Sequence, residues 1–234
     1  MHAAMLHDDA VAVVLAAGVG SRLGEDMPKQ FLDINGVPVL AHTLTGLTWC
    51  AQILIVHHPH YLEQTCRLLR DHRFNGSLRL VSGGSTRRES IFAALAEVSD
   101  LADNIPLILQ NAASPNTPKR LVTQCLDALG TYDIAQAYVP AVHTIFSHGN
   151  GELLQVLARD KLGYSVDPTV YRLGCLRRVV DAQLRSGANG EMTLDTARNL
   201  GLRVGLVPSP ESNVKITTLN DLATLRVLMA DSQE

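Results

Sequence analysis

The sequence contains few aromatic residues and no excess of basic charge. Phe, Trp and Tyr make up 4% of its 234 residues, and 20 Lys and Arg stand against 23 Asp and Glu, which gives a formal net charge of −3. A chain with this balance has no general basic field to hold nucleic acid or an anionic membrane. We therefore expect neither as a partner, and any phosphate that the protein binds must be held locally.

Long apolar runs and patterned cysteines are also missing. The run from Val11 to Ala17 is far too short to span a bilayer. Residues 1–10 lack the basic start and apolar stretch of a signal peptide, so we expect a cytoplasmic protein. The cysteines match neither a zinc ligand set nor a redox pair, and we predict that all four are reduced packing residues. They are Cys50, Cys66, Cys125 and Cys175.

The residues that are present indicate one large α/β domain. Apolar residues make up 46% and charged residues 18%, which is ordinary globular composition. The length favours one domain over residues 1–234 rather than two. Short β-branched runs alternate with helical patterns, and this alternation is typical of a mostly parallel sheet with helices on both faces.

The expected elements are six strands and six helices. The strands are Val11–Leu15, Gln52–His57, Leu78–Val81, Pro106–Gln110, Ile134–Pro140 and Arg203–Val207; the helices are Val39–Cys50, Tyr61–Asp71, Arg87–Val98, Pro118–Leu129, Leu173–Ser186 and Leu219–Met229. Thr86 with Glu89, and Thr218 with Asp221, predict capped helix starts. Residues 142–170 fit neither pattern, and we expect them to leave the sheet as a functional or interaction arm.

A glycine-rich loop follows the first predicted strand. Strand Val11–Leu15 runs into Gly18, Gly20 and Gly24, at the sheet edge where such folds bind ligands. A dinucleotide fingerprint would need glycine where Leu23 stands, and a Walker loop would need Gly-Lys-Ser/Thr. Arg22 and Lys29 suit a nucleoside triphosphate attacked at its α-phosphorus, because charge develops on the departing oxygens. A tight turn with two solvated cations is the alternative.

These residues carry a family resemblance. The run from Leu15 to Leu23, followed by Pro28-Lys29-Gln30-Phe31, resembles the nucleotide loop of 2-C-methyl-D-erythritol 4-phosphate cytidylyltransferases, within the sugar-nucleotide pyrophosphorylases. Residues 83–90 and 213–217 resemble two further motifs of that family, and the similarity covers nearly the whole chain. It implies a Rossmann-like nucleotidyltransferase fold with a protruding dimerisation arm.

The resemblance also implies a site. Arg22, Lys29 and Lys215 would stabilise the triphosphate as an alditol phosphate attacks it. On the arm, Thr144 and Arg159 would reach the substrate of the second subunit in a homodimer with exchanged arms, and Thr193 would also contact substrate. The implied nucleotide-binding residues are Ala16, Ala17, Gly18, Gly20, Ser21, Gly83, Arg87, Ser90 and Ala112.

The chain departs from the family pattern where metal and acceptor are expected. The two metal carboxylates are replaced by Asn111 and Ser212, and an arginine on the acceptor side is replaced by Ser114. An amide and a hydroxyl bring no negative charge, so Mg²⁺ is expected to be held weakly by the protein. Three hypotheses stay open: the family reaction with CTP, a non-catalytic nucleotide-binding paralogue, and transfer to another alditol phosphate or phosphonate.

Three histidines, His57, His58 and His60, form a possible metal cluster. Neighbours on a strand point to opposite faces, which favours a polar strand end instead.

Overall fold

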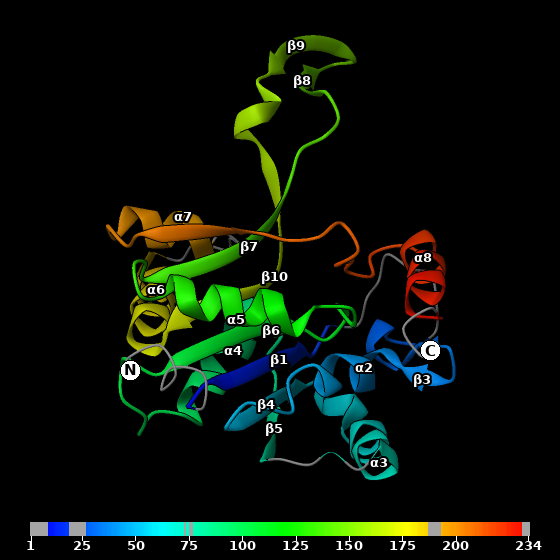
Figure 1. The fold of residues 1–234 in the computed structure, drawn as a ribbon. Helices are drawn as coiled ribbons and strands as arrows, with labels where there is room; N and C mark the ends of the chain where they lie inside the picture. The colour runs from blue at the N-terminus through cyan, green and yellow to red at the C-terminus, as the bar shows by residue number, and fades with distance from the viewer. Residues whose placement is uncertain (1–8, 19–26, 73, 75–76, 187–192, 231–234) are drawn as a thin grey trace.

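A computed structural model describes residues 9–18, 27–72, 74, 77–186 and 193–230 of the chain (Figure 1). The strands are β1 Val11–Ala16, β2 Asp33–Ile34, β3 Val37–Pro38, β4 Gln52–His57, β5 Leu78–Ser82, β6 Pro106–Asn111, β7 Ile134–Pro140, β8 Ile145–Gly149, β9 Glu152–Leu157, β10 Gly163–Arg172 and β11 Val204–Pro208. The α-helices are α2 Val39–Thr45, α3 Leu62–His72, α4 Arg87–Ala96, α5 Lys119–Ala128, α6 Leu173–Ser186, α7 Thr193–Asn199 and α8 Leu219–Ala230. Short 3₁₀ turns are η1 Lys29–Phe31, η2 Pro59–Tyr61 and η3 Arg159–Lys161.

Seven strands form one central sheet in the order β11-β7-β10-β6-β1-β4-β5. All neighbours run parallel except β10, which is antiparallel to both β6 and β7. The mostly parallel α/β sheet predicted from the sequence is confirmed. Its central strand β1 reads VAVVLA because a strand covered on both faces must be apolar throughout.

The helices divide between the two faces of the sheet. Ala12 and Val14 of β1 belong to a core with residues of α2, α3 and α5. Val11 and Val13 point to the opposite side, into a core with residues of α4, α6 and α7. This alternation follows from the two-residue period of a strand. A smaller core joins β2, the first residue of α2 and α8 around Ile34, Val39 and Leu225.

All twelve predicted elements exist; β4, β7 and α6 have the predicted bounds, and the other nine differ at one or both ends. The predicted helix Val39–Cys50 is wrong in its second half, because α2 ends at Thr45 and Gly46 is the C-cap. Leu47 and Cys50 are still buried, which explains why the apolar pattern continued. Both capped starts are confirmed: Thr86 and Glu89 form a capping box, and Asp221 Oδ2 accepts from Thr218 N at 2.7 Å. All four cysteines are free, and no helix of the described ranges is long and apolar enough to cross a membrane.

The segment 142–170 contains two different structures. Strands β8 and β9 form a hairpin that projects away from the rest of the fold (Figure 1). From Gly163 onward the chain returns as β10, which lies inside the central sheet. The expectation that all of this segment leaves the sheet is therefore wrong for residues 163–170, because β10 pairs with strands far away in sequence.

Two hairpins turn on the same dipeptide. Asn35-Gly36 joins β2 to β3, and Asn150-Gly151 joins β8 to β9, all four residues having positive φ. Asn and Gly adopt this conformation most readily, which matches the tight turn between twisted strands. The first hairpin places Ile34 in a core, whereas the second is exposed along most of its length.

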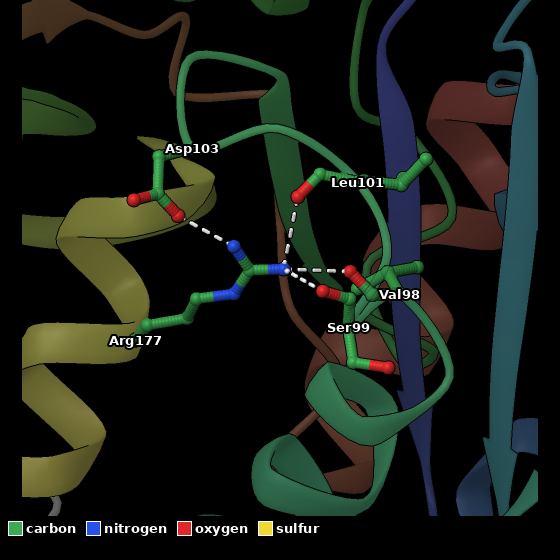
Figure 2. A network of polar contacts seen from close by, with 5 residues as sticks. All are labelled: Val98, Ser99, Leu101, Asp103 and Arg177. Carbon is green, nitrogen blue, oxygen red and sulfur yellow. Dashed lines mark hydrogen bonds and ion pairs between the residues drawn. The ribbon is translucent and has the colours of Figure 1, made fainter.

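Arg177 on α6 joins that helix to the residues that follow the end of α4. Figure 2 shows Arg177 donating to the carbonyls of Val98 at 2.7 Å and of Ser99 and Leu101 at 3.1 Å, and pairing with Asp103. Carbonyls after a helix end lack intrahelical partners, so a guanidinium is suited to satisfy several of them. This contact holds α4, whose first turn faces the candidate site.

Candidate active site

A pocket of about 680 Å³ lies at the carboxyl ends of β1 and β6. Four residues that the resemblance assigns to nucleotide binding line it: Ala17, Gly18, Ser90 and Ala112. Among the described residues, the cations Lys29, Arg87 and Lys215 also line it. None of the described lining residues is acidic, so this pocket suits an anion.

Lys29 is placed by the short turn η1. The buried side chain of Gln30 donates to the carbonyl of Ala16 at 2.8 Å, which fixes η1 beneath the end of β1. The ammonium of Lys29 reaches the carbonyls of Ile216 and Thr217, each at 3.3 Å. One lysine therefore connects the loop after β1 with the segment that carries Lys215.

The segment that carries Lys215 is fixed from both ends. Ile216 N donates to the carbonyl of Ala113 at 2.9 Å, which joins the segment to the end of β6. Asp221 accepts from Thr217 N at 2.8 Å at the start of α8. Burial is the largest single effect on this carboxyl and raises its pKa, but the hydrogen bonds from Thr217 and Thr218 together outweigh it, so the pKa of Asp221 is lowered.

Loop 83–86 forms the side of the pocket next to α4. Glu89 Oε2 accepts from Ser85 N at 2.7 Å, from Ser85 Oγ at 2.9 Å and from Thr86 N at 3.3 Å. The Ser85 hydroxyl and backbone bonds are the main causes that lower the pKa of this carboxyl. Gly83 lies where a Cβ would come within 2.5 Å of the Ala17 Cβ, so only glycine lets the two loops meet.

Arg87 begins a chain of polar contacts that leads from the pocket into the sheet. Its guanidinium donates to Asn111 Oδ1 at 2.7 Å. The Nδ2 of Asn111 donates to Asp167 Oδ1 at 2.7 Å and to Oδ2 at 2.9 Å. Ser114 Oγ also donates to Asp167, whose side chain on β10 is buried. Asn213 Nδ2 donates to the backbone carbonyl of Asp167 at 2.6 Å.

A protein-family comparison covers almost all of this architecture. The family model described as IspD, 2-C-methyl-D-erythritol 4-phosphate cytidylyltransferase, matches residues 10–231. The chain belongs to this family. The family is one of cytidylyltransferases, which are nucleotidyltransferases that use CTP and methylerythritol phosphate.

Individual relatives agree with the family match. A 2-C-methyl-D-erythritol 4-phosphate cytidylyltransferase of Thermobifida fusca is 32% identical, over 93% of this chain and 92% of the relative. A bifunctional ribulose 5-phosphate reductase/CDP-ribitol pyrophosphorylase of Haemophilus influenzae is 29% identical over 91% of this chain, which spans 46% of that longer protein.

Solved structures support the same fold. The 4-diphosphocytidyl-2C-methyl-D-erythritol synthase of Anaerococcus prevotii superimposes with a TM-score of 0.80 at 19% identity, over 95% of this chain and 98% of that one. The Francisella tularensis 2-C-methyl-D-erythritol 4-phosphate cytidylyltransferase gives a TM-score of 0.78 at 22% identity, over 97% and 100%. The predicted Rossmann-like nucleotidyltransferase fold is confirmed.

IspD enzymes generally depend on a divalent metal ion, but the residues expected to hold it here do not fit. Asn111 lines the pocket, yet its amide oxygen accepts from the Arg87 guanidinium. Ser212 does not line the pocket, and its carbonyl accepts from Asn116 at 3.0 Å. Within the described ranges, no three His, Cys, Asp or Glu side chains are grouped to hold a metal ion.

Other predicted residues of the IspD site lie away from the pocket wall. Thr144 and Arg159 belong to the projecting segment, where Arg159 donates to the carbonyl of Val142 at 3.1 Å. Thr193 begins α7 and is hydrogen-bonded to Tyr171, whose pKa is raised chiefly by burial. Ala16 is buried behind the loop. The predicted residues Gly20, Ser21 and Arg22 lie outside the described ranges.

The three histidines have other partners. His57 is buried, with its Nδ1 at 3.1 Å from the carbonyl of His58. His58 Nδ1 accepts from the backbone N–H of His60 at 3.2 Å. This arrangement is a polar strand end, which the sequence favoured over a metal cluster.

The residue that the sequence missed is Asp167. It carries no predicted role, yet it joins Asn111 to Ser114. The available signal was an acid beside proline in a strand-like run, but its partner on β6 is 56 residues away in sequence. No local pattern connects such a pair.

Proposed function

We propose that this protein transfers CMP from CTP to 2-C-methyl-D-erythritol 4-phosphate and releases pyrophosphate, in isoprenoid precursor synthesis in the cytoplasm. The observation that carries the proposal is the pocket in which Lys29, Arg87 and Lys215 meet with no acidic described residue beside them. Membership of the IspD family supplies the nucleotide and the acceptor. Mg²⁺ is the ion that we expect to accompany CTP.

The reaction needs charge stabilisation rather than a general base. A phosphate oxygen of the acceptor, already ionised at pH 7, forms a bond to the α-phosphorus of CTP. The bond from that phosphorus to the bridging oxygen breaks, and pyrophosphate leaves with the electron pair. Lys29 and Lys215, with Arg22, would stabilise the charge that moves onto the departing oxygens.

The cytidine would lie against loop 83–86 and the start of α4. Gly83 allows this loop to approach Ala17, while Arg87 and Ser90 line the pocket from α4. Gly18, Ala112 and Asn111 line the same pocket. The backbone N–H groups of the glycine-rich loop, including Gly20 and Ser21, would approach the phosphates.

The acceptor side would be completed by a second copy of the chain. We propose a single domain over residues 1–234 whose projecting segment crosses to a partner, bringing Thr144 and Arg159 to the partner's pocket, while Thr193 acts from its own chain. The exposed apolar side chains of the hairpin support this proposal. Leu153 is 61% and Leu154 68% exposed, and contact with another chain would remove them from water.

The function is tested by mixing purified protein with CTP, MgCl₂ and methylerythritol 4-phosphate and following pyrophosphate release. We expect release that depends on both substrates. Absence of release while CTP binding persists in calorimetry would contradict the proposal and support a non-catalytic nucleotide-binding protein. Sedimentation of the same sample tests the exchanged arms, because a monomer at micromolar concentration would contradict them.

A second candidate is transfer of CMP to another alditol phosphate. The observation that favours it is Ser114, which stands where the family resemblance places an arginine and donates to the buried Asp167, so this position brings no positive charge to an acceptor. The Haemophilus influenzae relative, by its name a CDP-ribitol pyrophosphorylase, shows that related chains serve another alditol. Ribitol 5-phosphate in the same assay separates the candidates through the ratio of the two kcat/KM values.

A further inference from the structure

A buried carboxylate lies directly behind the pocket wall. Asp167 is 6% exposed and accepts from Asn111 and Ser114. Its place follows from the sheet. Strand β10 pairs Thr169 with Leu109 of β6, and just beyond this pair the side chains of Asp167 and Asn111 are hydrogen-bonded. On the other side, the pairing with β7 is interrupted between Ser165 and Thr169. This irregularity leaves Asp167 outside the β7 ladder.

The carboxylate fixes which way the Asn111 amide points. An ionised carboxylate only accepts hydrogen bonds, so the Nδ2 group of Asn111 must face Asp167. The amide oxygen then faces the pocket side and accepts from Arg87 at 2.7 Å. From the pocket inward, the hydrogen-bonded groups are therefore the Arg87 guanidinium, the Asn111 amide and the Asp167 carboxylate. The negative charge is therefore separated from the pocket by one hydrogen-bonded side chain.

This order leaves the pocket without a protein ligand suited to a divalent ion among the described residues. A metal at Asn111 Oδ1 would compete with the guanidinium for the same oxygen, and the two positive charges would repel each other. Asp167 already holds two side-chain donors and is buried. The cations Lys29, Arg87 and Lys215 remain to neutralise a triphosphate.

We infer that the pocket binds a nucleoside triphosphate without a metal ion held by the protein, and that the Asn111–Asp167 pair prevents the protein itself from holding a divalent metal. This inference rests on the proposed function for the identity of the nucleotide. A metal ion enters only as part of the nucleotide complex. The pair thus determines whether nucleotide binding depends on metal.

The pair offers an isosteric exchange as the test. Asn111→Asp alone sets two carboxylates against each other in a buried place, and Asp167→Asn alone sets two amides together. The double variant Asn111→Asp with Asp167→Asn restores one amide and one carboxylate. It moves the negative charge to the pocket wall beside Arg87, so we name it the exchange variant. The matched control is Gln124→Glu, which adds the same charge on the exposed face of α5, away from the pocket lining and from the projecting segment.

Calorimetry with CTP is performed in EDTA and in excess MgCl₂. For the natural chain and for Gln124→Glu, we expect CTP to bind in EDTA at least as tightly as with Mg²⁺. For the exchange variant, we expect affinity in EDTA to fall about tenfold or more, because a carboxylate then faces the triphosphate, and Mg²⁺ to restore it. MnCl₂ alone should give saturable binding to the exchange variant and none to the natural chain.

The outcomes separate the inference from the function. Binding of CTP to the natural chain only when Mg²⁺ is present, or saturable binding of Mn²⁺ alone, would overturn the inference and leave the function standing. No CTP binding in either buffer would overturn the proposed function and the inference with it. If the exchange variant does not fold, the EDTA and Mn²⁺ titrations of the natural chain decide the question by themselves.

Discussion

The two sides of the pocket are built on different principles. On one side, Lys29, Lys215 and Arg87 bring positive charge to the surface of the pocket, held by backbone carbonyls and a capped helix. On the other side, Asn111, Ser114 and Asp167 satisfy one another inside the protein. We call these the cationic side and the polar side.

The two sides of the pocket differ in whether their side chains serve ligand binding or the stability of the fold. The cationic side keeps the residue types that the IspD resemblance requires, and its side chains are available to a ligand. The polar side differs from that pattern at every position considered, and its members bind each other. Removal of a side chain on the first side should therefore alter ligand binding, and removal of a hydrogen-bond donor on the second should chiefly alter stability. The exchange variant differs from such a removal because it moves a negative charge to the pocket wall.

The largest expected effect is from Lys29→Ala on the cationic side. Removal of one group that stabilises transition-state charge typically lowers kcat by about 10²–10³-fold. Pyrophosphate release measures this loss, and urea unfolding should show little change. Arg67→Ala, which removes an exposed cation of α3, is the control and should keep full activity. Equal activity of Lys29→Ala and Arg67→Ala would contradict the assignment of ligand binding to the cationic side.

Ser114→Ala tests the polar side. It removes one donor from a buried carboxylate, and loss of such a charged hydrogen bond costs about 1.5–3 kcal/mol of unfolding free energy. Urea unfolding measures the loss, with Ser147→Ala on the exposed strand β8 as the control, expected within about 0.5 kcal/mol of the natural chain. A Ser114→Ala variant of unchanged stability but altered CTP affinity would reverse our assignment of roles.

Thr86→Ala probes the capped helix that supports the cationic side. The Thr86 hydroxyl accepts from Glu89 N at 3.1 Å, and loss of an N-cap costs about 1 kcal/mol. Thermal or urea unfolding should detect this change, whereas Thr131→Ala, in an exposed turn, should be neutral. A cost equal to that of Ser114→Ala would mean that the two sides contribute alike to stability.

The smallest effect is the pH dependence due to Glu89. Hydrogen bonds from Ser85 and Thr86 lower the pKa of this carboxyl below its ordinary value of 4.5. Its contribution to stability is therefore complete above about pH 4.5 and is lost as the pH falls through the lowered value. Glu89→Gln should be less stable than the natural chain at pH 7, and the difference in unfolding free energy should narrow as the pH falls below about 4.5. A difference that is constant with pH would refute this assignment.

The fold could be predicted where local patterns decide it. The apolar run of β1, the helical spacing of α6 and the Thr86 capping box all depend on residues near one another in sequence. The cationic side followed from the motif resemblance, because Lys29 and Lys215 stand in recognisable runs. The structure brings these two distant runs together at the Ile216 and Thr217 carbonyls.

The polar side could not be predicted, because it depends on pairing over long distances. Strand β10 contains Asp167 and Pro168, which interrupt its alternation and conceal the strand. It pairs with β6 and β7, and this pairing depends on the tertiary fold and not on the local sequence. The hairpin of β8 and β9 was predictable in principle, since Asn150-Gly151 is a strong turn signal. Only the joint register of β6 and β10 places Asp167 against Asn111.

Loop 83–86 has a thermodynamic consequence for any ligand. Glu89 holds this loop through Ser85 and Thr86 before a ligand arrives. Ordering the backbone of one residue costs about 1–2 kcal/mol in conformational entropy. In this loop the conformational entropy is lost when the protein folds. A nucleotide that binds here does not have to order the loop, so less of its favourable contact free energy is offset on binding.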